Sequence, residues 1–263
     1  MKPPPHTRQP GQHELQPLLN LLDSGRLAQA ANAARTLLER FPDAPVVHHV
    51  LANALAGQGK FAEAIESCRK LVGANPQSAE LHFNLAVVAS QAGRLEEAVA
   101  SYERTIALAP RLADAHYNLG TALQALGRFD AAAASYRRAV ELEPGYFEAH
   151  GNLGAVLQLQ GKLADAVESY RRALAIHPDA RGHFNLGTAL SNQGRLGEAI
   201  ASYRKALAID PNHADAATSL GEALFHQGQP EAAIASYRHA LAIAPEHPEA
   251  NYNLGIFLYD AGE

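Results

Sequence analysis

The stretch ADAHYNLGTALQALGRFDAAAASYRRAVELEPGY, residues 113–146, is followed at once by a variant of itself, FEAHGNLGAVLQLQGKLADAVESYRRALAIHPD, residues 147–179. On both sides of this pair, prolines recur every 34 residues, with a single interval of 33, at Pro42, Pro76, Pro110, Pro144, Pro178, Pro211 and Pro245. A glycine column keeps the same rhythm at Gly25, Gly59, Gly93, Gly127, Gly161, Gly194, Gly228 and Gly262. An alanine column does so at Ala30, Ala64, Ala98, Ala132, Ala166, Ala199 and Ala233. Such self-similarity is the signature of a repeat architecture.

Each repeat is predicted to be a pair of helices. In the first half of the quoted stretch, His116, Leu119 and Leu123 have the spacing of one helix face, and Ala132 and Tyr136 do so in the second half. The turn between the helices falls at the column glycine, which accepts a positive φ, and the next turn falls at the proline, which cannot continue a helix. A second set of glycines is expected to lie opposite the alanine column, where two backbones approach closely: Gly120, Gly154, Gly187, Gly221 and Gly255.

A tyrosine column in the second helix completes the pattern at Tyr102, Tyr136, Tyr170, Tyr203 and Tyr237. Together with the leucine that precedes the Gly or Ala of the first helix, these columns resemble the tetratricopeptide-repeat (TPR) family. The resemblance covers about Gly11 to Glu263. It implies an all-α fold, namely a right-handed superhelical TPR solenoid of antiparallel helix hairpins.

The columns also predict the domain organisation. Residues 1–12 are expected to be a disordered segment, and residues 13–263 a TPR array whose first unit, 13–44, is degenerate because Pro17 interrupts its first helix. Full units are predicted at 45–78, 79–112, 113–146, 147–179, 180–213 and 214–247, followed by the first helix of an eighth unit at 248–263.

The last predicted helix lacks a partner that would cover its apolar residues. These are Leu254, Ile256, Phe257 and Leu258. Because a repeat array needs a polar outer face on its terminal unit, we expect the sequence to be a fragment of a longer protein. We also expect end-to-end self-association through this C-terminal helix, which would remove apolar surface from water.

Composition narrows the classes of partner. The net charge of -5 gives no basic excess of the kind that nucleic-acid-binding proteins carry, so no nucleic-acid partner is expected. No run of eighteen apolar residues and no signal peptide is found, which predicts a cytoplasmic protein without a membrane partner. The single cysteine, Cys68, occupies the tyrosine column and is expected to be a small buried hydrophobe.

Asparagines form the candidate binding site. Two residues before the Gly/Ala column of the first helix, the repeats carry Asn84, Asn118, Asn152, Asn185, Ser219 and Asn253. This position points away from the packing stripe, toward the concave groove of such a superhelix. An amide both donates and accepts hydrogen bonds, so it suits a peptide unit of any sequence. Helices about 8–10 Å apart would offer one amide for every two to three residues of an extended chain, at about 3.3 Å per residue. The alternative is that asparagine is an ordinary solvent-facing residue here.

An asparagine ladder in a long array resembles the repeat region of the O-linked N-acetylglucosamine transferases, most closely from Ala149 to Leu163. In that family the ladder binds the backbone of protein substrates and delivers them to a glycosyltransferase domain. The resemblance implies a peptide-binding role for Asn84, Asn118, Asn152, Asn185 and Asn253, in the substrate-recognition part of a larger glycosyltransferase-like protein. The alternative function is a structural assembly scaffold that binds folded partners by its convex or terminal surfaces.

No other motif predicts chemistry. The histidine column His48, His82, His116, His150 and His183 is interpreted as packing, because helices about 8–10 Å apart cannot share one metal ion through bonds of about 2.0–2.1 Å. Acidic residues at the starts of the first helices argue against a carboxylate clamp, with Arg181 the exception. Basic pairs such as Arg171-Arg172 are expected to be neutralised, for example by Glu168. No phosphate loop, zinc spacing or nucleophile motif is present, so no enzyme activity, cofactor or metal is predicted.

Overall fold

The computed structural model describes the backbone of residues 9–260 and the side chains of residues 9–256, and all regular structure in that range is helical. The helices are α1 (Gln12–Asp23), α2 (Leu27–Arg40), α3 (Pro45–Gly57), α4 (Phe61–Ala74), α5 (Ala79–Gln91), α6 (Leu95–Leu108), α7 (Ala113–Ala125), α8 (Phe129–Leu142), α9 (Phe147–Leu159), α10 (Leu163–Ile176), α11 (Ala180–Asn192), α12 (Leu196–Ile209), α13 (Ala214–His226), α14 (Pro230–Ile243) and α15 (Pro248–Asp260).

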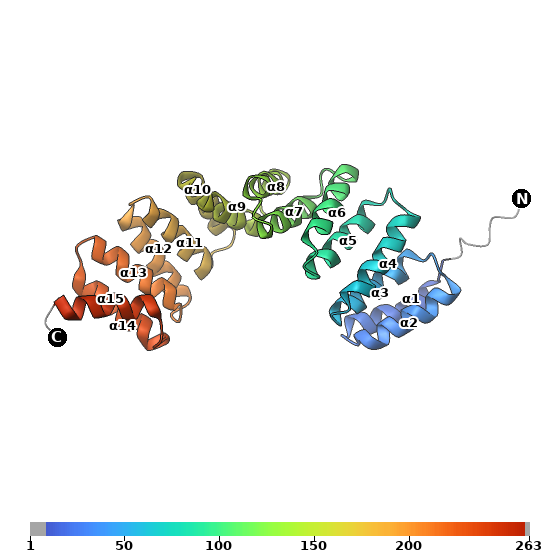
Figure 1. Cartoon of the computed structure of the whole chain (residues 1–263), viewed down its shortest axis with the longest axis horizontal. Coiled ribbons are helices and arrows are strands. Elements are labelled where there is room, and N and C mark those ends of the chain that lie inside the picture. Colours follow the sequence, from blue (N-terminus) through green and yellow to red (C-terminus); the bar gives the residue numbers. More distant parts are fainter. Residues whose placement is uncertain (1–8, 261–263) are drawn as a thin grey trace, which may run out of the picture. The chain divides into compact units, whose positions relative to one another are not determined.

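The chain divides into two compact units (Figure 1). Unit 1 is Met1–Leu142 and holds α1 to α8, and unit 2 is Glu143–Glu263 and holds α9 to α15. We call the odd-numbered helices A helices and the even-numbered ones B helices. Within each unit, every A helix packs against the B helix that follows it, and each B helix packs against the next A helix. Successive A helices also touch in the pairs α1–α3, α3–α5, α5–α7, α9–α11 and α11–α13, so each unit has an A face and a B face.

The turn from each A helix to its B helix is closed by a glycine with positive φ. At Gly59, φ is +74°, the Gly59 N–H donates to Ala56 O at 2.9 Å, and the Lys60 N–H donates to Leu55 O at 2.9 Å. These two bonds form a Schellman motif, which satisfies carbonyl groups at the helix end. The motif requires a residue in the left-handed backbone conformation, which glycine adopts without strain. The next helix therefore begins two residues after the glycine, as the antiparallel hairpin requires.

The histidine column fixes the turn from a B helix to the next A helix. The rings of His48, His82, His116 and His150 are buried, and each bonds through Nε2 to the carbonyl of the proline six residues earlier, at 2.7–3.1 Å. These four histidines are buried packing residues, as predicted, but their proline bonds reach the preceding predicted unit and do not stay within one repeat. After Pro178 the turn is one residue shorter, so His183 lies five residues on and has no such bond; instead, the Asp179 carboxylate accepts from the Gly182 N–H.

The glycines of the A helices lie against tyrosine rings, which corrects the expected partner. A Cβ built on Gly120, Gly154, Gly187 or Gly221 would stand 2.6–2.8 Å from atoms of the tyrosine sixteen residues later, and not against the alanine column. Tyrosine and alanine share one face of the B helix, but only the ring is large enough to reach the A helix at this point. The pairs are Gly120–Tyr136, Gly154–Tyr170, Gly187–Tyr203 and Gly221–Tyr237.

The first helix differs from its prediction at two points. Residues 1–8 of the expected disordered segment lie outside the described residues, whereas Pro10 is buried and α1 begins at Gln12. Pro17 does not interrupt the helix, which continues through it to Asp23. A proline removes a single backbone bond, here to the carbonyl of His13, and an exposed position near the start of a helix tolerates that loss.

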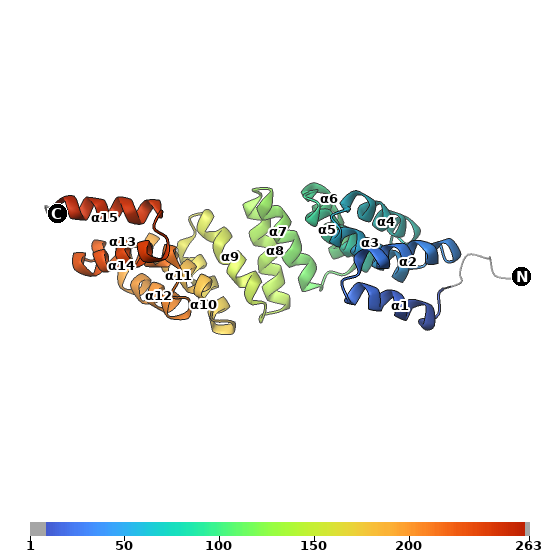
Figure 2. The ribbon, with the colours of Figure 1, turned by 90° about the horizontal axis from the view of Figure 1, so that it is seen from below.

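The last helix, α15, packs on α14 (Figure 2). Two of its large side chains are exposed. Tyr252 is 70% exposed and Ile256 43% exposed. The predicted apolar residues Phe257 and Leu258 have side chains outside the described range. Self-association through α15 stays a prediction.

Candidate functional site

All five predicted ladder asparagines lie on A helices, and each is half-buried. In unit 1, Asn84 belongs to α5 and Asn118 to α7. In unit 2, Asn152 belongs to α9, Asn185 to α11 and Asn253 to α15. The structure therefore presents the ladder as two sets, one on the A face of each unit.

The ladder amides differ in their hydrogen bonding. Among the described residues, Asn118 and Asn185 form no side-chain hydrogen bond within the protein, so both amide groups are open to a ligand. The Nδ2 of Asn253 donates to Glu222 Oε1 at 3.0 Å, and Asn84 Nδ2 lies 2.8 Å from His49 Nδ1. Both partners sit on the preceding A helix, so these amides link neighbouring repeats. The ladder thus contains free amides as well as amides that already have an internal partner.

Tyrosine hydroxyls of the B helices reach the ladder positions of the next repeat, a contact that sequence analysis missed. The Tyr203 hydroxyl interacts with Ser219, and the Tyr237 hydroxyl interacts with Asn253. Burial raises the pKa of Tyr237 to about 12, so this hydroxyl stays protonated at neutral pH. The spacing between the two columns, sixteen residues except for fifteen from Tyr170 to Asn185, was the available signal. These two tyrosines therefore contact ladder positions of the next repeat through their hydroxyls, and their rings also pack on a glycine of the A helix.

A histidine joins two asparagines on the A face of unit 1. The Nε2 of His49 lies 3.0 Å from Asn53 Nδ2, and its Nδ1 lies 2.8 Å from Asn84 Nδ2. A neutral imidazole has one acceptor nitrogen, so only one of the two Nδ2 groups can donate to the ring.

Two hollows flank Asn84. One, of about 630 Å³, lies between α3 and α5 and is lined by Asn53, Ala56, Gly57, Phe61, Asn84, Val87, Val88 and Gln91. The other, of about 400 Å³, lies toward the starts of the same helices and is lined by Pro45, Val46, His49, Asn75, Ser78, Glu80, Leu81 and Asn84. The Asn84 side chain thus stands between two depressions, as expected of a contact point for a chain laid across the helices.

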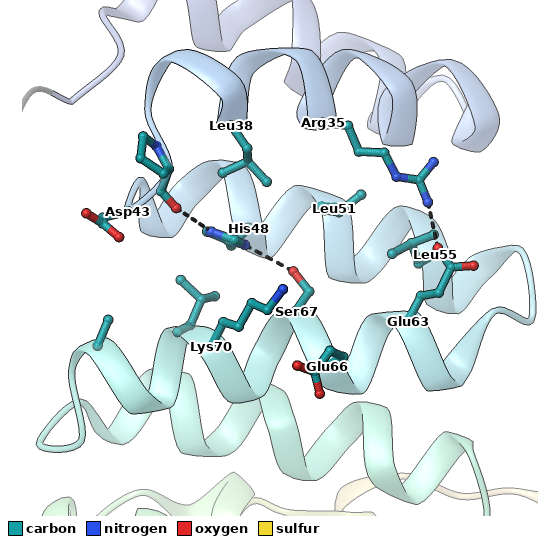
Figure 3. A pocket seen from close by; sticks show the side chains of 13 residues that line it. Arg35, Leu38, Asp43, His48, Leu51, Leu55, Glu63, Glu66, Ser67 and Lys70 are labelled. Carbon is teal, nitrogen blue, oxygen red and sulfur yellow. Dashed lines mark hydrogen bonds and ion pairs between the residues drawn. The ribbon is translucent and has the colours of Figure 1, made fainter. Parts of the chain in front are cut away.

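A third hollow opens among α2, α3 and α4 (Figure 3). It has a volume of about 630 Å³, an apolar floor that includes Leu38, Leu51 and Leu55, and charged residues such as Lys70 at its rim. Figure 3 shows His48 spanning the hollow between Pro42 O, at 2.7 Å from Nε2, and Ser67 Oγ, at 3.1 Å from Nδ1. Since Nε2 must donate to the carbonyl, Nδ1 accepts from the serine hydroxyl. The pair therefore completes the polar bonding of a buried histidine.

Ion pairs neutralise several of the basic side chains along the B helices. The predicted pair within one helix is confirmed by Arg172 Nε, which lies 2.9 Å from Glu168 Oε1. Other arginines bridge to the next B helix at 2.7–2.8 Å: Arg35 to Glu63, Arg69 to Glu97 and Arg171 to Glu198. Exposed pairs of this kind contribute about 0–1 kcal/mol each. They set the charge pattern of the surface more than the stability of the fold.

In the part of the chain that the structure describes, no group of three or more His, Cys, Asp or Glu side chains could hold a metal ion. No described helix combines the length and the apolar character needed to cross a bilayer.

A family model described as tetratricopeptide repeat matches residues 19–79, 49–113, 117–181 and 184–248, well over half of the chain. No curated protein matches the sequence. Among solved structures, YrrB, a TPR protein with an unusual peptide-binding site, superposes with a TM-score of 0.66 at 26% identity, over 72% of this chain and 98% of YrrB. A MamA structure gives 0.60 at 27% identity, over 63% of this chain and 97% of MamA. The C-terminal part of a TPR repeat-containing protein from Cytophaga hutchinsonii gives 0.75 at 16% identity, over 91% and 98%.

Proposed function

Because the chain belongs to the tetratricopeptide repeat family, whose members are protein-interaction modules, we propose that its A faces bind an extended polypeptide through the asparagine ladder. The observation that carries this proposal is the pair of free, half-buried amides at Asn118 and Asn185. A half-buried amide without an internal partner is costly unless water or a ligand satisfies it. A peptide backbone supplies the matching donor and acceptor.

The geometry favours an extended chain in each unit. Successive A helices of TPR-type hairpins lie about 8–10 Å apart, which spans about three residues of extended backbone. In unit 1 the ladder residues are Asn84 and Asn118; in unit 2 they are Asn152, Asn185 and Asn253. YrrB, which has a peptide-binding site, supports this assignment by its 26% identity. A larger glycosyltransferase-like parent and a cytoplasmic location belong to the same proposal.

The experiment is a selection of binders from a random 12-residue peptide library, followed by dissociation constants for Asn118→Ala and Asn185→Ala. We expect at least one of the two variants to weaken the selected peptides by about threefold to tenfold, the value of one hydrogen bond of about 0.5–1.5 kcal/mol. Asn32→Ala on α2 and Asn212→Ala in the turn after α12 are matched controls, because both side chains are exposed away from the A helices. If all four variants bind the selected peptides with equal affinity, the asparagine ladder is not the peptide-binding site.

The hollow among α2, α3 and α4 favours one alternative function, a scaffold that docks a folded partner at this hollow. Its apolar floor at Leu38 and Leu51 and its charged rim at Glu66 and Lys70 resemble the centre and edge of a protein interface. Binding at this surface would be lost on reversing charge with Lys70→Glu and would not respond to Asn118→Ala. The two functions are therefore separable with the same set of variants.

A further inference from the structure

We propose that the hollow between α3 and α5 binds a tyrosine side chain of the peptide, beside the A-helix positions that a tyrosine hydroxyl of the chain itself reaches in later repeats. This inference deepens the proposed function and rests on it for the identity of the partner. It is carried by a comparison of the second repeat with the four repeats that follow.

In two of those repeats, the B-helix tyrosine bonds through its hydroxyl to a glutamine twelve positions earlier, on the A helix of the same repeat: Tyr136–Gln124 and Tyr170–Gln158. Tyr102 and Tyr203 have a serine at the same spacing, Ser90 and Ser191. The O···O distance is 2.9 Å for Tyr136–Gln124 and 3.3 Å for Tyr170–Gln158. Each ring thus runs from the B helix to the A face.

The second repeat lacks both members of this pair. Cys68 stands in the tyrosine column, and Ala56 stands where the others have serine or glutamine. Tyr136 also contacts Thr121 Oγ1, at 3.2 Å, and the residue equivalent to Thr121 in the second repeat is Asn53. Asn53 and Ala56 both line the hollow. Of the two positions that contact the Tyr136 hydroxyl in the fourth repeat, the second repeat thus keeps a polar side chain at Asn53 and has a small one at Ala56, and the space of about 630 Å³ beside them is open.

The lining suits a phenol. Val87 and Val88 from α5 and Phe61 from α4 supply apolar contacts for a ring. Asn53 and Asn84 supply amide groups, and Asn253, the ladder counterpart of Asn84, interacts with the Tyr237 hydroxyl. Asn84 is also a proposed contact of the peptide backbone. One residue thus joins the backbone site to the side-chain pocket, so that a peptide laid over Asn84 directs a nearby side chain into the hollow.

The pocket is tested apart from the peptide with p-cresol, the analogue of the tyrosine side chain. We expect p-cresol at millimolar concentration to shift the NMR signals of the Asn53 and Asn84 side-chain amides in the native chain and in Cys68→Ala. Cys68→Tyr restores the repeat pattern and should abolish these shifts. The tyrosine is accommodated next to an alanine in the third repeat, where Ala86 and Tyr102 are both buried. Ala56→Trp is a second blocking variant, which fills the hollow from α3 should Cys68→Tyr not fold.

Absence of p-cresol binding to the native chain, or equal binding to the blocked variants, would overturn the pocket. Peptides complete the test: a selected binder that contains tyrosine should lose at least tenfold in affinity on Tyr→Ala, and this loss should vanish in the blocked variants. If selected peptides respond to Asn118→Ala but show no tyrosine dependence, this inference fails and the proposed function survives. If p-cresol binds but no peptide does, the pocket stands and the proposed function fails.

Discussion

The ring of Tyr170 lies against the backbone of Gly154, so close that a Cβ atom on Gly154 would stand 2.8 Å from Cδ1 and Cε1 of the ring. We therefore expect Gly154→Ala to destabilise unit 2 by about 1–3 kcal/mol, the usual cost of inserting a carbon into a packed core. Gly151→Ala is the matched control on the same helix, because nothing lies within 4 Å of its Cβ position. It should stabilise the helix by roughly 0.5–1 kcal/mol. Urea unfolding measures both, and equal effects of the two substitutions would contradict the contact.

The histidine–proline bond predicts that alanine substitutions along the histidine column reduce stability by unequal amounts. His116→Ala removes the bond from Nε2 of a buried ring to Pro110 O, at 3.1 Å, so we expect a loss of about 0.5–1.5 kcal/mol from this bond. His183→Ala removes no such bond and eliminates a buried Nδ1 that has no partner, so its cost should be smaller. Thermal unfolding of the two variants gives the comparison. A larger loss for His183→Ala would refute the role assigned to the turn bond.

Stability should depend on pH through two histidines of unit 2. Burial lowers the pKa of His150 and of His183 below the ordinary value of 6.5. The unfolded chain then binds more protons than the folded chain between the two pKa values, so the stabilisation is complete above pH 6.5 and is lost as pH falls through the lowered values. Urea unfolding between pH 8 and pH 5 should show this decline. The double variant His150→Gln/His183→Gln should show a shallower decline, and an unchanged slope would contradict the assignment.

Cys68 should react with a thiol reagent only when the protein opens. The side chain is 2% exposed, and burial raises its pKa from 9.0 to about 11, which reduces the thiolate population about a hundredfold at any pH below both values. Modification by a water-soluble disulfide at pH 8 should be slow and should accelerate with urea along the unfolding curve. Rapid modification in native buffer would show that Cys68 is accessible.

The columns of proline, glycine and alanine predicted the repeats because each encodes a local event, a turn or a close contact, that needs no knowledge of distant residues. Helix rotation was harder to predict. Alanine and tyrosine share one face of the B helix, so spacing alone could not show that the ring, and not Ala132, lies over Gly120. Side-chain size decides that contact, and the sequence pattern does not weigh it.

The same limit explains what was missed at the site. The face that carries Asn84 and Asn253 was predicted from helix periodicity, but their partners His49 and Glu222 lie 35 and 31 residues earlier, on the preceding A helix. Such contacts depend on how one repeat rotates against the next. The open pocket likewise could not be predicted without knowing which residues the tyrosine hydroxyls contact, because Cys68 by itself predicts nothing more than a small buried residue.

The free amides of Asn118 and Asn185 lead to the central claim, that the ladder binds peptide backbone. The most direct test is the affinity of one selected peptide in its native form and with each backbone nitrogen methylated in turn, for the native chain and for Asn118→Ala/Asn185→Ala. We predict that methylation at one or two positions weakens binding to the native chain about threefold to tenfold, and that these penalties disappear in the double variant. Penalties that are identical in both proteins, or no penalty at any position, would contradict a ladder that binds the backbone.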